Sequence, residues 1–350
     1  MNIGTRHIGA GHPAYIIAEL GVNHDGRVDR ALDLTRAAAA AGADAVKLQL
    51  FETDRLMSKA AKLAAYQRAA GETDPIAMLR RLELRIDDMA QVVDLAHRLG
   101  IHAIVTVFSV ELAAVAVRLA WDAYKTASPD IVHRPLLEAL AATGKPLIVS
   151  TGASTIDEVR QAAAWLATAR ERLAFMQCVS CYPTPDDAAE LDGIASVAAA
   201  TGLPTGYSDH TSSVETGQLA VGRGACLLEK HFTYSRAAQG PDHAASLEAD
   251  GLARYVQLVR AAHAASSPSA RPHAKRILDI ERDVRTVSRQ SIVTTRAIRA
   301  GERLTRAHVT FKRPGTGLLP FQLDQAIGRT LTRDVDADVP LTADDLGLMP

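Results

Sequence analysis

Short apolar runs alternate with longer amphipathic stretches along the first 265 residues of the chain. The runs resemble strands buried on both faces, and many of the stretches between them have helical spacing and close with glycine. Eight strand–helix units in this order predict an α/β fold, a parallel (β/α)8 TIM barrel with its helices outside. A doubly wound open sheet is the alternative, but no G-x-G-x-x-G motif follows the first run. The predicted strands are residues 15–21, 45–51, 103–109, 123–128, 147–152, 174–180, 205–210 and 226–232.

Polar residues stand at the carboxyl ends of all these runs. In a barrel those ends gather at one face, where barrel enzymes carry their active sites. A polar residue in a single strand is usually a satisfied core group, whereas the same feature in every strand indicates a site. The residues in question are Glu19, Lys47, Gln49, Thr106, Lys125, Ser128, Ser150, Ser180, Asp209, His210, Glu229 and His231.

The composition and the hydrophobic pattern of the sequence change after residue 265. The stretch "AASSPSARPHAK" is polar and rich in proline and serine, which predicts a linker over residues 266–284. From 285 to 350, β-like pieces such as "SIVTTRAI" and "HVTFKRPG" alternate with turns and predict a small, mostly β domain. The barrel domain then covers residues 1–265.

Composition and charge exclude several classes of partner. The 350 residues have a net charge of −1, which provides no bulk attraction to nucleic acid or an anionic membrane. No apolar run approaches the roughly 20 residues that span a bilayer, and the N-terminus lacks the charged-then-apolar order of a signal peptide. Three cysteines are too few, and odd in number, for a disulfide framework. We therefore expect a soluble cytoplasmic protein. For the C-x-x-C pair Cys178 and Cys181, packing is favoured over a redox or zinc site, because positions three apart in a strand face opposite sides.

Lysine is scarce, with eight residues against 31 arginines, yet Lys47, Lys125 and Lys230 lie within or at the ends of apolar strands. An unpaired ammonium group is costly there, so an anionic group of the protein or of a ligand must compensate it. The compact charge of lysine suits phosphate or carboxylate oxygens, and Schiff-base formation is the alternative.

The stretch "STGASTIDEV" indicates the same kind of ligand. Ser154 or Thr155 can cap a helix whose free N–H groups would bind phosphate, and a capped helix with nothing bound is the plainer interpretation. Together with the strand-end lysines, Ser128 and Ser208, this helix start predicts a small ligand with several negative charges.

Two histidines close neighbouring strands of the predicted barrel. Imidazoles at the ends of adjacent strands, such as His210 and His231, can share a divalent metal, with ligand or water oxygens in the remaining positions. Each taken alone is more often a hydrogen-bonded core residue or a general base. Glu19 in "AELGVNH" and Asp242 in "GPDH" add carboxylates that can bind hydroxyls, act as a base or complete the metal shell, although "GPDH" is also a plain turn.

Nine segments, in order along almost the whole chain, together resemble the sialic acid synthase family. They are "IAELGVNHDG", "GADAVKLQLF", "YKTAS", "KPLIVSTGAST", "CVSCYPTP", "GYSDHTSS", "LEKHF", "GPDHAASLE" and "VTFKRPGTG". The resemblance implies a TIM barrel followed by a domain like the antifreeze-like (SAF) domain of that family. It also implies a transferase that condenses phosphoenolpyruvate with an N-acetylated amino sugar, N-acetylmannosamine or a diacetamido-trideoxyhexose. The products are a nine-carbon 3-deoxy-2-keto acid and phosphate.

The resemblance further implies a role for each site residue. His210 and His231 bind Mn²⁺ or Mg²⁺, which polarises the sugar aldehyde as a Lewis acid. Arg313 matches an arginine that reaches the site of the partner subunit and grips the N-acyl group, which implies a domain-swapped homodimer. Phosphoenolpyruvate is held by Lys47, Gln49, Lys125, Ser128, Ser150, Ser180 and Ser208. The sugar is held by Glu19, Asp130, Tyr182, Asp242 and Arg313, and the catalytic residues are Glu19, His210, His231 and Asp242.

Departures from the family pattern concern the sugar side. Ser128-Pro129-Asp130 stands where the family has S-G-E or S-G-D, and proline removes one backbone donor there. Ser180 stands where some members have asparagine, and "TVF" at 106–108 replaces a frequent T-P-F. These differences leave the aldose open. One alternative is a synthase of a shorter ketoacid that uses another aldose; a second is a non-catalytic sugar-binding protein, which has no need of paired histidines and buried lysines.

Overall fold

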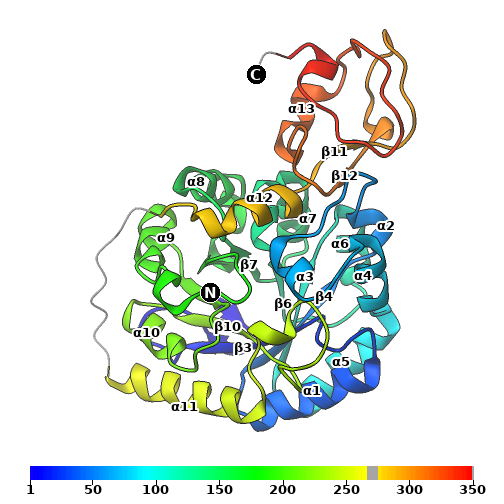
Figure 1. Ribbon diagram of the computed structural model, residues 1–350. Helices are drawn as coiled ribbons and strands as arrows, with labels where there is room; N and C mark the ends of the chain where they lie inside the picture. Colours follow the sequence, from blue (N-terminus) through cyan, green and yellow to red (C-terminus); the bar gives the residue numbers. More distant parts are fainter. Residues whose placement is uncertain (266–274, 349–350) are drawn as a thin grey trace.

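A computed structural model describes residues 1–265 and 275–348 of the chain as a barrel that carries a smaller domain (Figure 1). Parallel strands close the barrel in the order β10-β3-β4-β5-β6-β7-β8-β9, so the first and last of them pair. These are β3 (Tyr15–Gly21), β4 (Ala45–Leu50), β5 (His102–Val107), β6 (Ala123–Thr126), β7 (Leu147–Ser150), β8 (Leu173–Cys178), β9 (Thr205–Asp209) and β10 (Leu227–His231). The predicted (β/α)8 barrel is confirmed.

Helices cover the outside of the barrel. They are α1 (Val28–Ala40), α5 (Ile86–Arg98), α6 (Val110–Ala116), α7 (Arg134–Ala142), α8 (Ile156–Trp165), α9 (Gly193–Thr201), α10 (Thr216–Gly222) and α11 (Ala249–Ala265). Outward strand residues such as Ile16, Leu48 and Tyr124 form one apolar layer with these helices. Among the described residues, no helix combines the length and the apolar character needed to cross a membrane.

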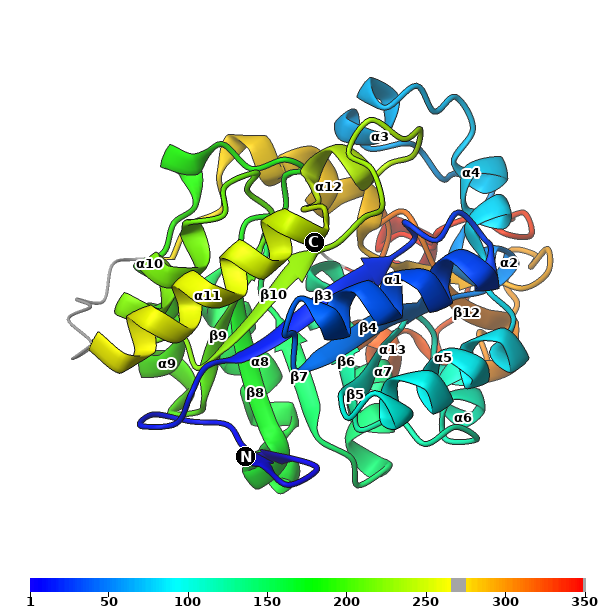
Figure 2. The same cartoon turned by 90° about the horizontal axis from the view of Figure 1, so that it is seen from below.

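The inward face of each strand changes from apolar to polar along its length. Successive side chains of a strand alternate between the two faces, so Tyr15, Ile17 and Glu19 of β3 share the interior. The first two belong to an interior apolar core, and Glu19 lines a pocket above it. A hairpin of β1 (Asn2–Ile3) and β2 (Arg6–His7) lies at the amino-terminal end of the barrel (Figure 2). Ile3 in this hairpin and Ile8 directly after it belong to the same apolar core. Polar groups at the other end are therefore gathered in one lumen.

A lid lies between β4 and α5 at the carboxyl end of the barrel. We use this name for residues 53–82, which contain the short helices α2 (Thr53–Leu56), α3 (Ala65–Ala69) and α4 (Pro75–Leu82). Apolar lid residues pack with Val22, Phe51 and Phe108 of the barrel in a separate cluster. Several of them also face the pocket, so the lid forms one of its walls.

The small domain follows the segment that was predicted as a linker. Residues 266–274 of the expected 266–284 linker lie outside the described residues, and residues 275–284 contain η5 (Asp279–Glu281) and the start of α12 (Arg282–Ser288). An ion pair of Arg276 with Glu190 and a buried Glu281 attach residues 275–284 to the barrel. The small domain has its own apolar core around β11 (Ser291–Thr294), β12 (Val309–Lys312) and α13 (Leu323–Ala326). The remaining short 3-10 turns are η1 (Ser128–Val132), η2 (Ala167–Arg172), η3 (Asp186–Ala188), η4 (His243–Ala245), η6 (Arg306–His308), η7 (Pro320–Gln322) and η8 (Asp344–Leu346).

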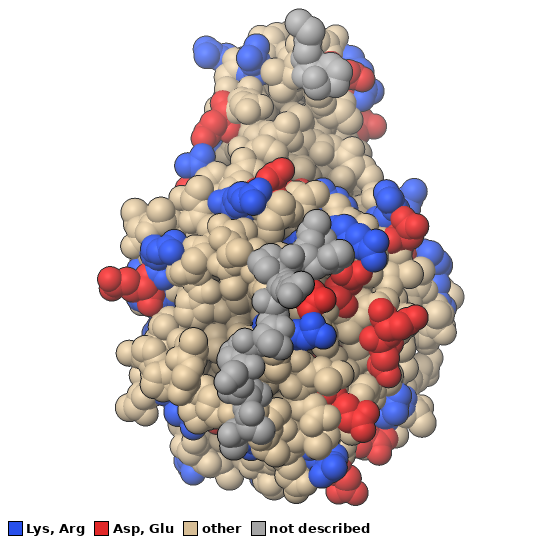
Figure 3. All heavy atoms as spheres, turned by 90° about the vertical axis from the view of Figure 1, so that its left-hand side faces the viewer, with Lys and Arg blue, Asp and Glu red and all other residues tan. Residues whose placement is uncertain are grey.

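Charged side chains of both signs are interspersed on the face of the molecule shown in Figure 3. Many exposed pairs join neighbouring helical turns, such as Arg134 with Glu138 at 2.8 Å and Arg160 with Asp157 at 2.8 Å. Isolated exposed pairs add at most about 1 kcal/mol each. The charges that bear on function are therefore the buried ones at the mouth of the barrel.

Candidate active site

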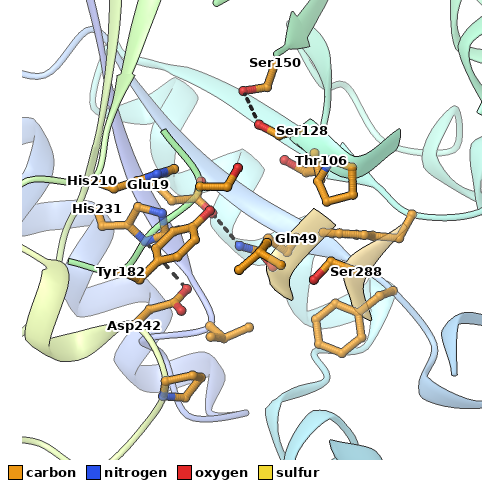
Figure 4. Close-up of a pocket in the computed structure, with 18 of the residues that line it drawn as sticks. Glu19, Gln49, Thr106, Ser128, Ser150, Tyr182, His210, His231, Asp242 and Ser288 are labelled. Atoms are coloured by element: carbon orange, nitrogen blue, oxygen red, sulfur yellow. Dashed lines mark hydrogen bonds and ion pairs between the residues drawn. The ribbon is translucent and has the colours of Figure 1, made fainter. Parts of the chain in front are cut away.

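A pocket with about 910 Å³ of empty space, part of it open to solvent, lies at the carboxyl ends of the strands. Figure 4 shows side chains from several strands and loops converging on it. With the exception of Asp130, every residue to which the family resemblance gave a role lines this pocket. These lining residues are Glu19, Lys47, Gln49, Lys125, Ser128, Ser150, Ser180, Tyr182, Ser208, His210, His231, Asp242 and Arg313.

Two buried ammonium groups occupy the floor of the pocket with two carboxylates. Lys47 Nζ lies 2.5 Å from Glu19 Oε2 and donates to Thr106 Oγ1 at 2.8 Å, and Lys125 Nζ lies 3.4 Å from Glu229 Oε1. Burial acts to lower the pKa of Lys47, but Glu19 and Glu229 outweigh it and raise that pKa. The pKa of Lys125 is lowered, chiefly by burial. The charge of Lys47 is thus compensated by a carboxylate at close range, whereas the charge of Lys125 is compensated by a more distant one.

A row of hydroxyl groups lies beside Lys125. Ser128 Oγ donates to Ser150 Oγ at 3.0 Å and accepts from the backbone N–H of Gly152 at 3.0 Å. A β-carbon at Gly152 would come within 2.2 Å of Ser180 Oγ, so only glycine fits between these serines. Ser180 Oγ is buried and has no hydrogen-bond partner among the described residues. These hydroxyl groups can donate to a small anion.

The helix that follows this row begins as the sequence indicated. Thr155 Oγ1 accepts from the N–H of Glu158, and the Glu158 carboxylate accepts from the N–H of Thr155, which completes a capping box. The backbone donors that these two side chains satisfy are therefore not open to a ligand. The serine hydroxyl groups, rather than the capped helix, are therefore the donors that line this part of the pocket.

The two predicted histidines meet on one side of the pocket, with ring centroids 5.3 Å apart. His210 Nδ1 lies 2.8 Å from the carbonyl oxygen of Val179. When Nδ1 carries the hydrogen and donates it to that oxygen, Nε2 of the neutral ring carries the lone pair that can bind a metal. Burial acts to lower the pKa of His210, while Cys178 and Glu229 raise it above its ordinary value. Burial, His210 and nearby lysines hold the pKa of His231 well below its ordinary value, so His231 is neutral.

These imidazoles fit a divalent metal as two ligands of an incomplete shell. His231 Nδ1 lies 3.6 Å from Asp242 Oδ2, the kind of carboxylate that orients a ligating imidazole. Among the described residues, no group of three or more His, Cys, Asp and Glu side chains could hold a metal ion. The remaining positions would therefore take oxygen atoms of substrate or water, and a proton on His210 would be displaced.

Carboxylate and aromatic groups form the side of the pocket near the lid. Gln49 Nε2 donates to Glu19 Oε1 at 2.8 Å, which holds that carboxylate in place. Burial, together with Glu19, raises the pKa of Asp242 to about 7. The Tyr182 ring lies 4.1 Å from that of His210 and 4.8 Å from that of Tyr66 in the lid, as measured between centroids.

Arg313 enters the pocket from the small domain of the same chain. Its N–H donates to the carbonyl of Leu56 at 2.9 Å, and its own carbonyl accepts from the N–H of Ser58 at 3.1 Å. The guanidinium lies over the Phe108 ring, with its carbon 5.5 Å from the centroid. In the single chain, backbone hydrogen bonds to the lid place Arg313 in the pocket of its own barrel. The family resemblance had instead placed this arginine in the site of a partner subunit.

Asp130 lies behind the pocket wall instead of in it. It accepts a hydrogen bond from Gln290 Nε2 at 3.2 Å, and its pKa is raised to about 7 by burial, which Arg313 partly offsets. Asp130 thus acts on Arg313 electrostatically. The direct sugar contact expected of Asp130 stays a prediction, although Asp130 is not among the residues that line the pocket.

Lys230 points away from the pocket, between the barrel and its helices. Its Nζ lies 3.0 Å from Asp209 Oδ2 and donates to the carbonyl of Thr211 at 2.7 Å. Both Lys230 and Asp209 are one position out of phase with the inward residues of their strands. Lys230 is therefore compensated by the protein and belongs to the scaffold.

Sequence reasoning gave no role to several groups that shape the pocket. Glu229 pairs with Lys125, and its position two residues before His231 was a signal that it shares the inward face. Tyr66 comes from the lid, whose sequence carries no strand-end pattern. Cys178, assigned to packing, lies with its sulfur 3.6 Å from His210 Nδ1, and all three cysteines are free thiols.

Comparison with known proteins adds to this geometry. The NeuB family model matches residues 34–270, and the SAF domain model matches residues 289–347. The chain is 34% identical over 347 residues to an uncharacterized protein of Methanocaldococcus jannaschii, which covers 99% of this chain and 98% of that protein. It is also 34% identical to the N,N'-diacetyllegionaminic acid synthase of Legionella pneumophila, over 97% of this chain and 96% of that protein.

Solved structures agree with the sequence comparison. The spore coat polysaccharide biosynthesis protein SpsE of Bacillus subtilis matches with a TM-score of 0.86 and 31% identity, over 100% of this chain and 99% of its own. The N-acetylneuraminic acid (sialic acid) synthetase of Leptospira borgpetersenii matches with a TM-score of 0.69 and 28% identity, over 78% of this chain and 92% of its own. The chain therefore belongs to the NeuB family of sialic acid synthase-type enzymes, transferases that form a carbon–carbon bond, and it carries a SAF domain.

Proposed function

We propose that this protein condenses phosphoenolpyruvate with an N-acetylated amino sugar, N-acetylmannosamine or a diacetamido-trideoxyhexose, in a metal-dependent reaction. The products are a nine-carbon 3-deoxy-2-keto acid of the sialic acid type and phosphate. The observation that carries the proposal is the convergence of Lys47, Lys125, His210 and His231 on one pocket. Basic groups and imidazoles in this arrangement suit an anionic substrate beside an aldehyde to be activated.

Phosphoenolpyruvate takes the floor of the pocket. Lys47, Lys125 and the row of Ser128, Ser150 and Ser180 offer the charge and the donors that its phosphate and carboxylate need. Within the described part of the chain, Lys125 has one carboxylate within 4 Å, that of Glu229 at 3.4 Å, so a substrate anion would compensate its charge further. Ser208 and Gln49 complete the lining on either side.

The sugar occupies the side of the pocket between the histidines and the lid. Carbon 3 of phosphoenolpyruvate forms a bond to the aldehyde carbon, and Asp242, which faces His231, protonates the aldehyde oxygen. Water then adds at carbon 2 and gives a proton to Glu19. The bond between carbon 2 and the phosphate oxygen then breaks, the hydroxyl group on carbon 2 gives its proton to the departing phosphate, and the ketone forms.

His210 and His231 are the groups that would hold Mn²⁺ or Mg²⁺ in this scheme. When bound there, the ion supplies Lewis-acid polarisation of the aldehyde. The hydrogen bond of His210 Nδ1 to the Val179 carbonyl orients the His210 ring, which supports this assignment. Asp242 Oδ2 lies 3.6 Å from His231 Nδ1, beyond hydrogen-bond distance. We further place the reaction in the cytoplasm, since three free cysteines suit a reducing compartment.

One assay tests the proposed function. The protein is incubated with Mn²⁺, phosphoenolpyruvate and a panel of aldoses, and both phosphate release and product mass are measured. We expect release only with N-acetylated hexosamines, together with a product whose mass equals the sugar plus pyruvate. Release with arabinose or erythrose alone would assign a shorter ketoacid synthase. No release with any aldose would favour a sugar-binding protein.

Replacing Arg313 with alanine is expected to raise the KM for the sugar by about 10- to 100-fold and to change the KM for phosphoenolpyruvate little, since hydrogen bonds from a charged group are worth about 1.5–3 kcal/mol. Arg313 lies near the lid and Phe108, away from the floor lysines. Steady-state kinetics with each substrate varied in turn measure the effect. Arg299→Ala, which removes an exposed arginine paired with Asp334 in the same domain, is the matched control. Equal losses for both substrates would contradict the sugar contact.

We also propose that the protein is a homodimer in which Arg313 of one subunit lines the pocket of the other. This follows the resemblance, and the single chain makes the same contact within itself. Arg313→Ala and Lys47→Ala chains, co-expressed so that they form mixed dimers, are then expected to show more activity at low sugar concentration than either variant alone. Mixtures without recovery would assign the arginine to its own barrel.

A further inference from the structure

A segment between the two domains crosses the mouth of the barrel next to β7 and β8 (Figure 1). We call residues 275–289 the strap. Lys275 Nζ donates to Gln177 Oε1 at 2.7 Å, and Arg276 pairs with Glu190 at 2.9 Å. Farther along, Arg285 and Arg289 both pair with the Glu158 carboxylate at 2.8 Å. The strap is therefore attached to the barrel on both sides of η5.

Glu281 is the buried carboxylate in the middle of the strap, with 1% of its surface exposed. One of its oxygens, Oε1, accepts from the backbone N–H of Ala153 at 2.6 Å and from that of Ser180 at 2.8 Å. The other, Oε2, accepts from the N–H of Leu278 within the strap at 3.0 Å. A single side chain thus joins the loop after β7 to the loop after β8.

Both barrel donors belong to the loops that carry the proposed phosphate contacts. Ala153 follows Gly152, whose N–H donates to Ser128 Oγ, and it has a left-handed backbone with φ of 50°. Residues other than glycine disfavour this conformation, so a contact from outside the loop must stabilise it. Ser180 holds its hydroxyl in the pocket without a partner among the described residues.

We infer that Glu281 is a positioning residue for the phosphate end of the phosphoenolpyruvate site. This inference rests on the proposed function. Glu281 does not line the pocket, so it acts through Gly152 and Ser180 and not on the substrate itself. Its ionised oxygen makes charge-assisted hydrogen bonds to two N–H groups from behind the loops. Those bonds hold the two loops in place, so that the Ser180 hydroxyl faces the pocket and Gly152 keeps its hydrogen bond to Ser128.

Glu281→Ala tests the inference in the full-length protein. We expect the dissociation constant for phosphoenolpyruvate, measured by calorimetry without sugar, to rise about 10- to 100-fold, because two buried donors lose their acceptor. The KM for the sugar should stay within about twofold, since the lid side is untouched. Glu281→Gln keeps one carbonyl oxygen as acceptor and should restore most of the affinity. Asp279→Ala, which removes an exposed carboxylate from the same strap, is the control and should bind like the wild type.

Each result decides between a positioning role and a purely structural one. If Glu281→Ala weakens both substrates equally, or if Glu281→Gln is no better than alanine, the inference is overturned. Thermal unfolding of each variant identifies one that does not fold. In that case Glu281→Asp decides, because its shorter arm cannot reach both donors and should weaken phosphoenolpyruvate alone. Wild-type protein that binds no phosphoenolpyruvate contradicts the proposed function, whereas normal binding in both wild type and Glu281→Ala contradicts this inference only.

Discussion

Replacing His231 with alanine is expected to reduce turnover by about 10³-fold or more, since Lewis-acid polarisation of a carbonyl is worth several kcal/mol. His231 is 5% exposed and lies on the inward face at the end of β10, so the change removes one imidazole from the pocket and leaves the helix layer intact. Two measurements check the result. Phosphate release gives the rate, and calorimetric titration with Mn²⁺ shows whether the metal still binds.

The control for this variant is His97→Ala, which removes an exposed imidazole that lies 2.9 Å from Asp122 on the outside of the barrel. It should keep wild-type turnover. Chelation of metal from the wild-type protein should reproduce the loss, and added Mn²⁺ should restore the wild type but not His231→Ala. Full activity of His231→Ala after removal of trace metal would refute the metal role.

Replacing Lys125 with methionine is expected to lower kcat/KM for phosphoenolpyruvate by about 10²- to 10³-fold, because loss of one partner of a buried charge pair costs 2–5 kcal/mol. Methionine keeps most of the volume of the lysine stem, so packing around β6 changes little. The variant removes the cation that is only loosely compensated by Glu229. Lys47 retains both of its carboxylates.

Direct binding of phosphoenolpyruvate separates this effect from a loss of stability. Lys125→Met should show weaker binding and a somewhat lower unfolding midpoint, since Glu229 loses an opposite charge. Lys145→Met, in the exposed turn before β7, is the matched control and should change neither. Wild-type affinity for phosphoenolpyruvate in Lys125→Met would show that the anion binds elsewhere.

The barrel was predictable because each strand carries its own signal. Near-continuous apolar runs are what burial on both faces requires, and helical spacing between them sets the alternation of elements. The polar residues were equally visible, since Glu19, Lys47 and His231 stand within or at the ends of apolar runs. Parallel strands place their carboxyl ends at one face, so these residues could be grouped before any coordinates were known.

The partners of these residues were not predictable in the same way. Lys47 and Lys230 look alike in the sequence, yet one faces the pocket beside Glu19 and the other faces Asp209 behind the strand. A shift of one position along a strand moves a side chain to the opposite face. Because both faces of these strands are apolar, the sequence does not show which residues point into the barrel. The direction of the Asp130 side chain could not be predicted either, because its short turn has no periodicity.

The sequence by itself determined the barrel, the mouth that bears the site and the kinds of charged and imidazole groups found there, because these follow from local periodicity and from the geometry of parallel strands. Only the tertiary structure decided which carboxylate meets which lysine, that Arg313 and the lid close the pocket, and that Glu281 reaches the loops after β7 and β8. Those contacts join segments far apart in the chain. Their free energy depends on burial and distance, which no local pattern records.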